Sequence, residues 1–205
     1  MFTLYYAPAS CAIASHLALE HAGAPYVAER LDFKAQEQRS AAYLAINPKG
    51  RVPALVTPQG ILTETPALLH FIAQSFPQAG LAPLDDPFLL ARLNAFHSYL
   101  CATVHVAHAH RFRGYRWADD AQAIAAMRAK VPQNMAECFA LIEADLHGPW
   151  VLGERFSSGD FYLFTVARWL EGDGVDVNQF PKVADHLRRM HDVPAVAKVL
   201  PLYQA

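Results

Sequence analysis

The first eighty residues alternate short apolar runs with helical patterns. Four apolar runs have the length of strands, and the last two flank Pro58-Gln59-Gly60, a hairpin-like turn. A strand, a helix and a second strand within thirty residues predict a parallel pair joined by a right-handed crossover. The pattern therefore predicts an α/β domain with a four-stranded mixed sheet. The expected strands are 2–6, 26–31, 54–57 and 61–63, and the expected helices are 11–22 and 65–76, the second capped by Thr65.

From residue 88 onward the apolar positions follow helical periods and show no strand pattern. Residues 79–87 carry Gly80, two prolines and two aspartates, which is typical of a linker. We therefore expect residues 1–78 to form the α/β domain and residues 88–205 an all-α domain. The expected helices of the second domain are 88–112, 119–146, 161–170, 180–191 and 194–200.

One helix start in the second domain carries a capping box. Ser157 has the side chain of an N-cap, and Asp160, three residues later, can bond back to it. Phe156 and Phe161 can pack against each other as a hydrophobic staple. The helix that follows is apolar nearly all round, so we expect it to run through the core of the helical domain.

Composition narrows the class of protein. The net charge of −2 lacks the basic excess of a nucleic-acid-binding protein. The N-terminus does not resemble a signal peptide, and no apolar run approaches the length of a membrane span. The three cysteines form no CxxC pair, which favours a reducing cytoplasm over a disulfide framework.

Cys11 is the first candidate for chemistry. The strand pattern ends at Tyr6, and after a Pro-containing turn the helical pattern places Cys11 in the first helical turn. The unpaired N–H groups and the dipole of the helix favour an anion there, so we expect a lowered thiol pKa. Ser10 and Tyr5 are near enough in sequence to donate hydrogen bonds to a thiolate. The alternative is a small, buried apolar side chain.

Two further segments suggest a peptide-like ligand. In NPKGRVPAL (47–55), a cis Val52–Pro53 bond would turn the backbone of Val52 toward the Cys11 turn, where an extended ligand can pair with it. The alternative is an ordinary proline at the start of a strand. At Glu64-Thr65-Pro66, a helix N-terminus can hold a carboxylate while Glu64 holds an ammonium group, or the triplet is a plain helix cap.

Together, YYAPASC, NPKGRVPAL and TETP resemble the glutathione S-transferase superfamily, and the cysteine resembles its bacterial beta class. The capping box also matches this superfamily. The resemblance covers the whole chain and implies a thioredoxin-like N-terminal domain, an all-α C-terminal domain and a homodimer. It implies that glutathione is the co-substrate and that no metal is needed. It places Cys11, Ser10 and Tyr5 at the glutathione sulfur, and it implies that the Val52–Pro53 bond is cis. The glutathione-binding residues it implies are Val52, Pro53, Glu64, Thr65, Lys34 and Arg51.

The resemblance also implies a histidine from the helical domain, and His105 falls where the beta class has it. A neutral imidazole there can accept the thiol proton. The beta class often has an asparagine seven residues before this histidine and a lysine just after it, where this chain has Ser98 and Val106. The repeated histidines of HVAHAH (105–110) allow a metal site, but no cysteine or carboxylate lies close in sequence, and we expect none.

Cationic and aromatic residues follow His110, and they are either a solvated helix end or one wall of a pocket for an aromatic electrophile. The substrate-pocket residues we expect are Phe112, Tyr115, Trp117 and Trp169. The sequence thus predicts a cytoplasmic enzyme that conjugates glutathione to hydrophobic electrophiles in an interdomain cleft, as in detoxification. The alternatives are a glutathione-dependent disulfide reductase that forms a mixed disulfide at Cys11, and a non-catalytic glutathione-binding scaffold.

Overall fold

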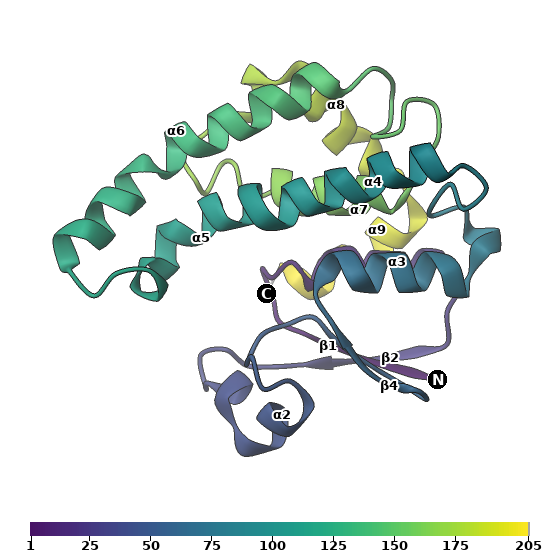
Figure 1. The fold of residues 1–205 in the computed structure, drawn as a ribbon, viewed down its shortest axis with the longest axis horizontal. Coiled ribbons are helices and arrows are strands. Elements are labelled where there is room, and N and C mark those ends of the chain that lie inside the picture. Colours follow the sequence, from purple (N-terminus) through teal and green to yellow (C-terminus); the bar gives the residue numbers. More distant parts are fainter. Residues whose placement is uncertain (205) are drawn as a thin grey trace. The chain divides into compact units, whose positions relative to one another are not determined.

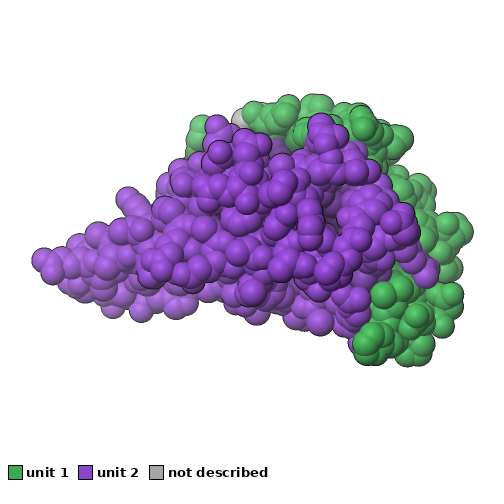
Figure 2. Space-filling model, turned by 90° about the horizontal axis from the view of Figure 1, so that it is seen from above, with its two compact units in different colours: residues 1–90, 191–205 green, residues 91–190 purple. Residues whose placement is uncertain are grey.

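The computed structural model describes residues 1–204 and divides into two compact units, which Figure 2 colours separately. Unit 1 contains residues 1–90 together with the stretch that begins at His191, and unit 2 contains residues 91–190. The domains expected from sequence, 1–78 and 88–205, stay a prediction. The packing of the chain divides it after Leu90 and joins its last stretch to the first unit.

Unit 1 is built on the predicted four-stranded mixed sheet (Figure 1). The central strand β1 (Phe2–Tyr6) pairs in parallel with β2 (Tyr26–Arg30). On its other side, β1 pairs antiparallel with β3 (Ala54–Thr57), which forms a hairpin with β4 (Gly60–Thr63). The order β2-β1-β3-β4, with one parallel and two antiparallel pairs, is that of a thioredoxin-like domain and confirms the predicted fold class.

The helices of unit 1 are α1 (Ala12–His21), α2 (Ala41–Ile46), α3 (Thr65–Ser75) and α9 (Pro194–Val199). Helix α1 contacts both α3 and α9, and its first eight residues are all buried. Figure 1 shows α2 on the opposite side of the sheet from α3. Because α1 is covered on more than one face, its sequence is apolar nearly all round rather than amphipathic.

The C-terminal stretch packs on α1. His16 is 1% exposed, and its Nδ1 lies 3.2 Å from the hydroxyl of Tyr203. Lys198 of α9 pairs with Glu20 at 2.7 Å. Burial lowers the pKa of His16 from the ordinary 6.5 to about 4, because the charged imidazolium would lose its hydration there. His16 is therefore neutral at pH 7 and serves the packing of unit 1.

Two helix ends in unit 1 can be compared with those predicted from the sequence. Helix α1 ends at His21 with Ala22 as its C-cap, and Gly23 follows with φ +63°, the left-handed conformation expected of a C-terminal glycine. The prediction that Thr65 caps α3 is wrong, because the helix starts one residue earlier than the pattern suggests. Thr65 is its first residue, and Glu64 occupies the cap position with φ +74°.

Unit 2 is helical. The predicted helix over 88–112 is one path in three parts: α4 (Pro87–Tyr99), a π-helical segment (Leu100–Val104) and α5 (His105–Arg113). A π segment has a longer hydrogen-bond repeat than an α-helix, so it shifts the direction of every side chain that follows. His105, the first residue of α5, is directed by this shift. The other helices of unit 2 are α6 (Ala121–Asp145), α7 (Ser158–Ala167) and α8 (Pro181–Met190).

Helix α7 is buried along its whole length, as predicted. The capping box at its start is confirmed, with Ser157 and Asp160 bonded reciprocally. Phe156 packs on Phe161 with ring centroids 5.1 Å apart, which confirms the hydrophobic staple. The carboxylate of Asp160 also accepts hydrogen bonds from the backbone N–H of Val151 at 2.8 Å and from His186 Nε2 at 3.0 Å.

The large apolar side chains of each unit fill its interior. Leu4, Leu17 and Leu69 have 0% exposure in unit 1, as do Phe139 and Phe164 in unit 2. Over residues 1–204, none of the helices combines the length and apolar character needed to cross a bilayer.

Candidate active site

The Cys11 sulfur lies where three backbone segments of unit 1 converge. Cys11 directly precedes α1 and is 9% exposed. Its Sγ lies 3.7 Å from the carbonyl oxygen of Val52 and 3.6 Å from the hydroxyl of Thr65, which donates to the sulfur. The predicted cis bond between Val52 and Pro53 is confirmed. A helix start, a loop carbonyl and a second helix start therefore surround one thiol.

The loop that presents Val52 is held by two side chains. Asn47 Nδ2 and the Tyr43 hydroxyl both donate to the carbonyl of Arg51, at 2.7 and 2.6 Å. Burial raises the pKa of Tyr43 to about 12, so its hydroxyl remains a donor at neutral pH. Gly50 has φ +59°, and a Cβ there would lie 2.9 Å from the backbone oxygen of Gln38. Only glycine therefore fits this turn.

Helix α3 begins with strained backbone. Glu64 has φ +74° and ψ +121°, a combination that costs a non-glycine residue on the order of 1–3 kcal/mol. Such strain persists where the surroundings impose it, and it concentrates at binding sites. The carboxylate of Glu64 is half exposed and pairs with Lys49 Nζ, which also donates to Thr63 Oγ1 at 2.7 Å. The start of α3 thus presents a carboxylate, an ammonium group and unpaired backbone donors together.

The other site residues predicted for unit 1 lie around this centre. The Ser10 hydroxyl donates to the carbonyl of Ala7 at 2.6 Å, and the Tyr5 ring packs on Tyr43 with centroids 5.5 Å apart. Lys34 and Arg51 are exposed. The Thr65 hydroxyl donates to the Cys11 sulfur, whereas the predicted role of Thr65 was to bind the γ-glutamyl end of glutathione. Cys138 is buried, and burial raises the pKa of its thiol, whereas Cys101 is half buried.

In unit 2, the structure groups two histidines with Trp169. The ring of His108 stacks on Trp169 at 4.2 Å with an interplanar angle of 17°, and the His105 ring is 4.9 Å from the same indole. His108 Nδ1 lies 2.7 Å from the buried carboxylate of Asp173, which Arg111 also approaches at 3.4 Å. Asp173 is 65 residues from His108 in sequence, so no local pattern indicates this pair.

The remaining residues of the predicted substrate pocket are on the surface of unit 2. Phe112 is 63% exposed, Tyr115 60% and Trp117 49%, and Trp117 packs on His110 at 4.3 Å. Of the four, Trp169 contacts His105 and His108. In the described part of the chain, no three His, Cys, Asp or Glu side chains are arranged to hold a metal ion.

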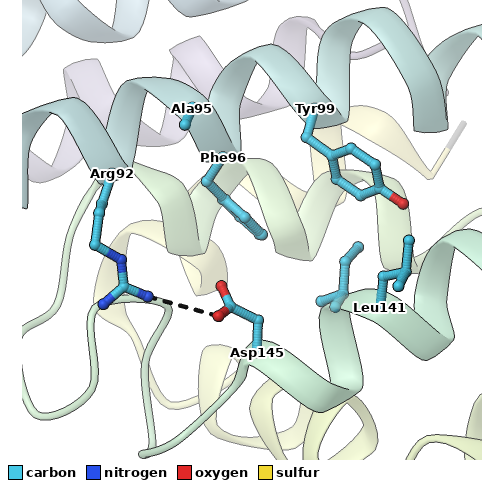
Figure 3. Close-up of a pocket in the computed structure, with 7 residues that line it drawn as sticks. Arg92, Ala95, Phe96, Tyr99, Leu141 and Asp145 are labelled. Atoms are coloured by element: carbon cyan, nitrogen blue, oxygen red, sulfur yellow. Dashed lines mark ion pairs between the residues drawn. The ribbon is translucent and has the colours of Figure 1, made fainter.

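Unit 2 also contains a pocket that the sequence analysis did not predict, with a volume of about 330 Å³ (Figure 3). It lies between α4 and α6, and an ion pair of 3.6 Å between Arg92 and Asp145 closes one end. Figure 3 shows Phe96, Tyr99 and Leu141 along the remainder. None of the predicted site residues lines this pocket. Its lining comes from α4 and α6, and the sequence pattern does not show that these two helices pack together.

The comparisons with known proteins identify the family. Residues 1–74 match the model of the glutathione S-transferase N-terminal domain, and residues 107–189 match that of the C-terminal domain. The glutathione S-transferase GstA of Escherichia coli O157:H7 is 30% identical over 202 residues, which cover 96% of each chain. This chain belongs to the glutathione S-transferase family.

Solved structures of this family agree with the fold. A glutathione transferase homologue from Sulfitobacter, with bound glutathione, shares 47% identity and a TM-score of 0.95, over 98% of this chain and 97% of that one. The beta-class glutathione S-transferase of Sphingomonas chungbukensis shares 29% identity and a TM-score of 0.85, over 98% of both chains. The family inferred from the N-terminal motifs, and its likeness to the beta class, are confirmed, and the protein is a glutathione transferase.

Proposed function

We propose that unit 1 binds glutathione beside Cys11 and that the glutathione sulfur, as a thiolate, attacks a hydrophobic electrophile held by unit 2. The observation that carries this proposal is the position of the Cys11 sulfur at the start of α1, where the Thr65 hydroxyl donates a hydrogen bond to it. Hydrogen-bond donors and a helix N-terminus stabilise a sulfur anion, and positioning against the electrophile supplies the rest of the rate enhancement.

Glutathione is extended along Val52, with its cysteinyl backbone paired to the backbone of that residue. Its γ-glutamyl carboxylate is bound by the N–H groups at the start of α3 and by Thr65. Its ammonium group is bound by Glu64, whose carboxylate faces Lys49 in the structure described above. The exposed side chains of Lys34 and Arg51 supply positive charge for the carboxylates of the tripeptide.

Cys11, Ser10 and Tyr5 form the sulfur end of the site, and His105 assists by accepting the thiol proton. Because the helix start already favours the thiolate, the contribution of His105 is smaller than that of unit 1. Trp169, with Phe112, Tyr115 and Trp117, provides apolar contacts for the electrophile. The enzyme acts in the cytoplasm in detoxification, as a homodimer, and closed two-fold pairing is the commonest arrangement of soluble oligomers. Sedimentation at micromolar concentration tests the dimer.

The second candidate reaction is disulfide reduction. The sulfur of Cys11, at a helix start, is suited to attack the glutathione sulfur of a mixed disulfide between glutathione and a substrate thiol. The bond from Cys11 to the glutathione sulfur would form as the substrate disulfide breaks and releases the substrate thiolate. A second glutathione, as thiolate, would then attack the Cys11 mixed disulfide, which yields oxidised glutathione and regenerates the Cys11 thiolate.

The deciding experiment measures conjugation of glutathione to 1-chloro-2,4-dinitrobenzene by the wild type and by Cys11→Ser. Conjugation that survives in the variant, with loss of disulfide reduction, makes the thiol of glutathione the nucleophile and Cys11 its neighbour. Loss of both activities makes Cys11 essential to the site. Retention on immobilised glutathione without any turnover contradicts both enzyme proposals and supports a scaffold.

Labelling provides a test that does not need turnover. If Cys11 is activated, iodoacetamide near neutral pH should modify it before Cys101 and Cys138, and a mixed disulfide with glutathione should protect it. Peptide mapping gives the order of modification. Equal labelling of all three cysteines would support the alternative of a buried apolar side chain.

A further inference from the structure

Unit 2 contains a histidine–carboxylate pair that the proposed function does not use. His108 Nδ1 lies 2.7 Å from Asp173 Oδ2, and the Asp173 side chain is 0% exposed. The imidazole also stacks on Trp169 at 4.2 Å. Two separate contacts therefore fix the ring, yet 12% of the His108 side chain still reaches solvent.

The pair determines which nitrogen of His108 is available. A carboxylate accepts hydrogen bonds, so Nδ1 keeps its proton and donates it to Asp173. Nε2 makes no hydrogen bond with any residue between 1 and 204. It is thus the atom that can exchange a proton with a bound molecule. A carboxylate that orients a histidine in this way is a recurring part of catalytic sites.

Asp173 is well placed to support a charged histidine. A buried carboxylate needs positive partners, and here they are His108 and, at 3.4 Å, Arg111. Gly172 makes room for this arrangement, because a Cβ at that position would lie 2.5 Å from Arg111 Nη1. When both nitrogens of His108 carry protons, Asp173 balances the positive charge of the ring.

His108 also lies among residues assigned to the second substrate. Its ring centroid is 6.4 Å from that of His105, the proposed acceptor of the thiol proton, and it stacks on Trp169, a proposed contact of the electrophile. His108 is therefore a neighbour of the residues that the proposed function assigns to the electrophile.

We propose that His108 donates a proton to electrophiles that carry an α,β-unsaturated carbonyl group, and that Asp173 is its positioning residue. This inference rests on the proposed glutathione transfer and names the class of electrophile for it.

The glutathione thiolate forms a C–S bond to the β-carbon, the C=C electron pair becomes the new double bond of an enol, and the C=O pair moves onto oxygen. That oxygen takes the proton of His108 Nε2, whose N–H pair stays on the ring. The enol then becomes the saturated ketone in water, and His108 regains from solvent the proton that the thiol released.

An aryl chloride does not need a proton donor for its reaction with glutathione. Its displacement releases chloride, and the negative charge of the intermediate resides on nitro groups that are too weakly basic to take a proton from imidazolium. A proton donor in unit 2 should therefore accelerate addition to an enone and leave aromatic substitution nearly unchanged. This difference between two substrates separates a chemical role of His108 from a structural one.

The test compares 4-phenylbut-3-en-2-one with 1-chloro-2,4-dinitrobenzene, each with glutathione, for the wild type and His108→Gln. We expect kcat for the enone to fall about 100-fold, a typical contribution of a positioned acid, while kcat for the aryl chloride stays close to that of the wild type. Asp173→Asn should shift the ratio of the two rates in the same direction but less. His147→Gln, which changes an exposed histidine of unit 2 that follows α6, is the control and should leave the ratio unchanged.

Equal losses on both substrates, or no loss on the enone, overturn the inference. A wild type that conjugates the aryl chloride but not the enone overturns it while leaving the proposed function intact, whereas inactivity on both substrates overturns the proposed function as well. If the variants do not fold, a solvent isotope effect measured on the wild type tests the inference instead. Turnover of the enone that slows more in D₂O than turnover of the aryl chloride supports the inference, and equal slowing contradicts it.

Discussion

Helices α3 and α7 begin in opposite ways. At the start of α7, the carboxylate of Asp160 is completely buried and accepts hydrogen bonds from Ser157, Val151 and His186. At the start of α3, Glu64 has strained backbone, no side-chain cap and a half-exposed carboxylate. A helix start that satisfies its own donors adds stability, whereas one that leaves them open is suited to bind a ligand. The two starts therefore separate residues that stabilise the fold from residues that we propose to bind glutathione.

The strongest test of this difference is Asp160→Ala. The substitution leaves the N–H groups of Val151 and Ser157 and the ring of His186 without their acceptor, so we expect a loss of about 3–5 kcal/mol of unfolding free energy. Urea unfolding measures it. Asp120→Ala removes a solvent-exposed cap of α6 and should cost only about 1 kcal/mol. Equal costs for the two variants would contradict the structural role of the buried network.

Lowering the pH should reduce the stability that the buried His16 gives to unit 1. The pKa of His16 is about 4 in the folded protein and the ordinary 6.5 in the unfolded chain, so between these values the unfolded chain binds the extra proton. The stability from the neutral ring is complete above pH 6.5 and is lost as the pH falls toward 4, by at most about 3 kcal/mol. Urea midpoints at pH 7 and pH 5 measure the loss. His16→Gln should reduce this dependence, and a dependence that the substitution leaves unchanged counts against the assignment.

Thr65→Val tests whether the start of α3 serves binding. The substitution keeps the shape of a buried side chain and removes the hydroxyl that reaches the Cys11 sulfur. We expect glutathione affinity to fall about tenfold, the effect of one lost hydrogen bond, with little change in stability. Titration calorimetry with glutathione measures the affinity. Thr3→Val, on the central strand β1, is the control, and an equal loss there would place the effect outside the Cys11 contact.

The smallest effect concerns the strain at Glu64. Glycine tolerates φ +74°, whereas alanine does not, so Glu64→Gly should be more stable than Glu64→Ala by about 1 kcal/mol. Both variants lack the carboxylate, so both should lose the same glutathione affinity. Thermal unfolding and glutathione titration of the pair separate backbone strain from ligand contact. An alanine variant as stable as the glycine variant would show that the conformation costs nothing.

What the sequence revealed depended on how far apart the interacting residues are in the chain. Ser157 and Asp160 are three residues apart, so a local pattern identified their box, and Gly23 ended α1 for an equally local reason. Thr65 and Cys11 are 54 residues apart, and no local pattern shows which hydroxyl reaches the sulfur. Family resemblance supplied the cis bond at Pro53, which physics alone left open.

The local sequence pattern also could not predict the directions of side chains in unit 2. A helical pattern over 88–112 predicts one face for His105, but the π segment at Leu100–Val104 changes that face. The same limit hid the pair of His108 and Asp173, which depends on how the turn after α7 packs against α5. Periodicity gives the existence of a helix, and tertiary packing decides what its side chains meet.

The return of the stretch from His191 to unit 1 determines how this molecule can be divided and recombined. Helix α9 covers a face of α1, and Tyr203 reaches His16 in its interior, so a fragment that ends at residue 90 leaves the helix behind Cys11 uncovered. A chimera that takes its helical unit from a relative therefore needs two junctions, one after residue 90 and one after residue 190. The C-terminal segment has to come from the same parent as the N-terminal half.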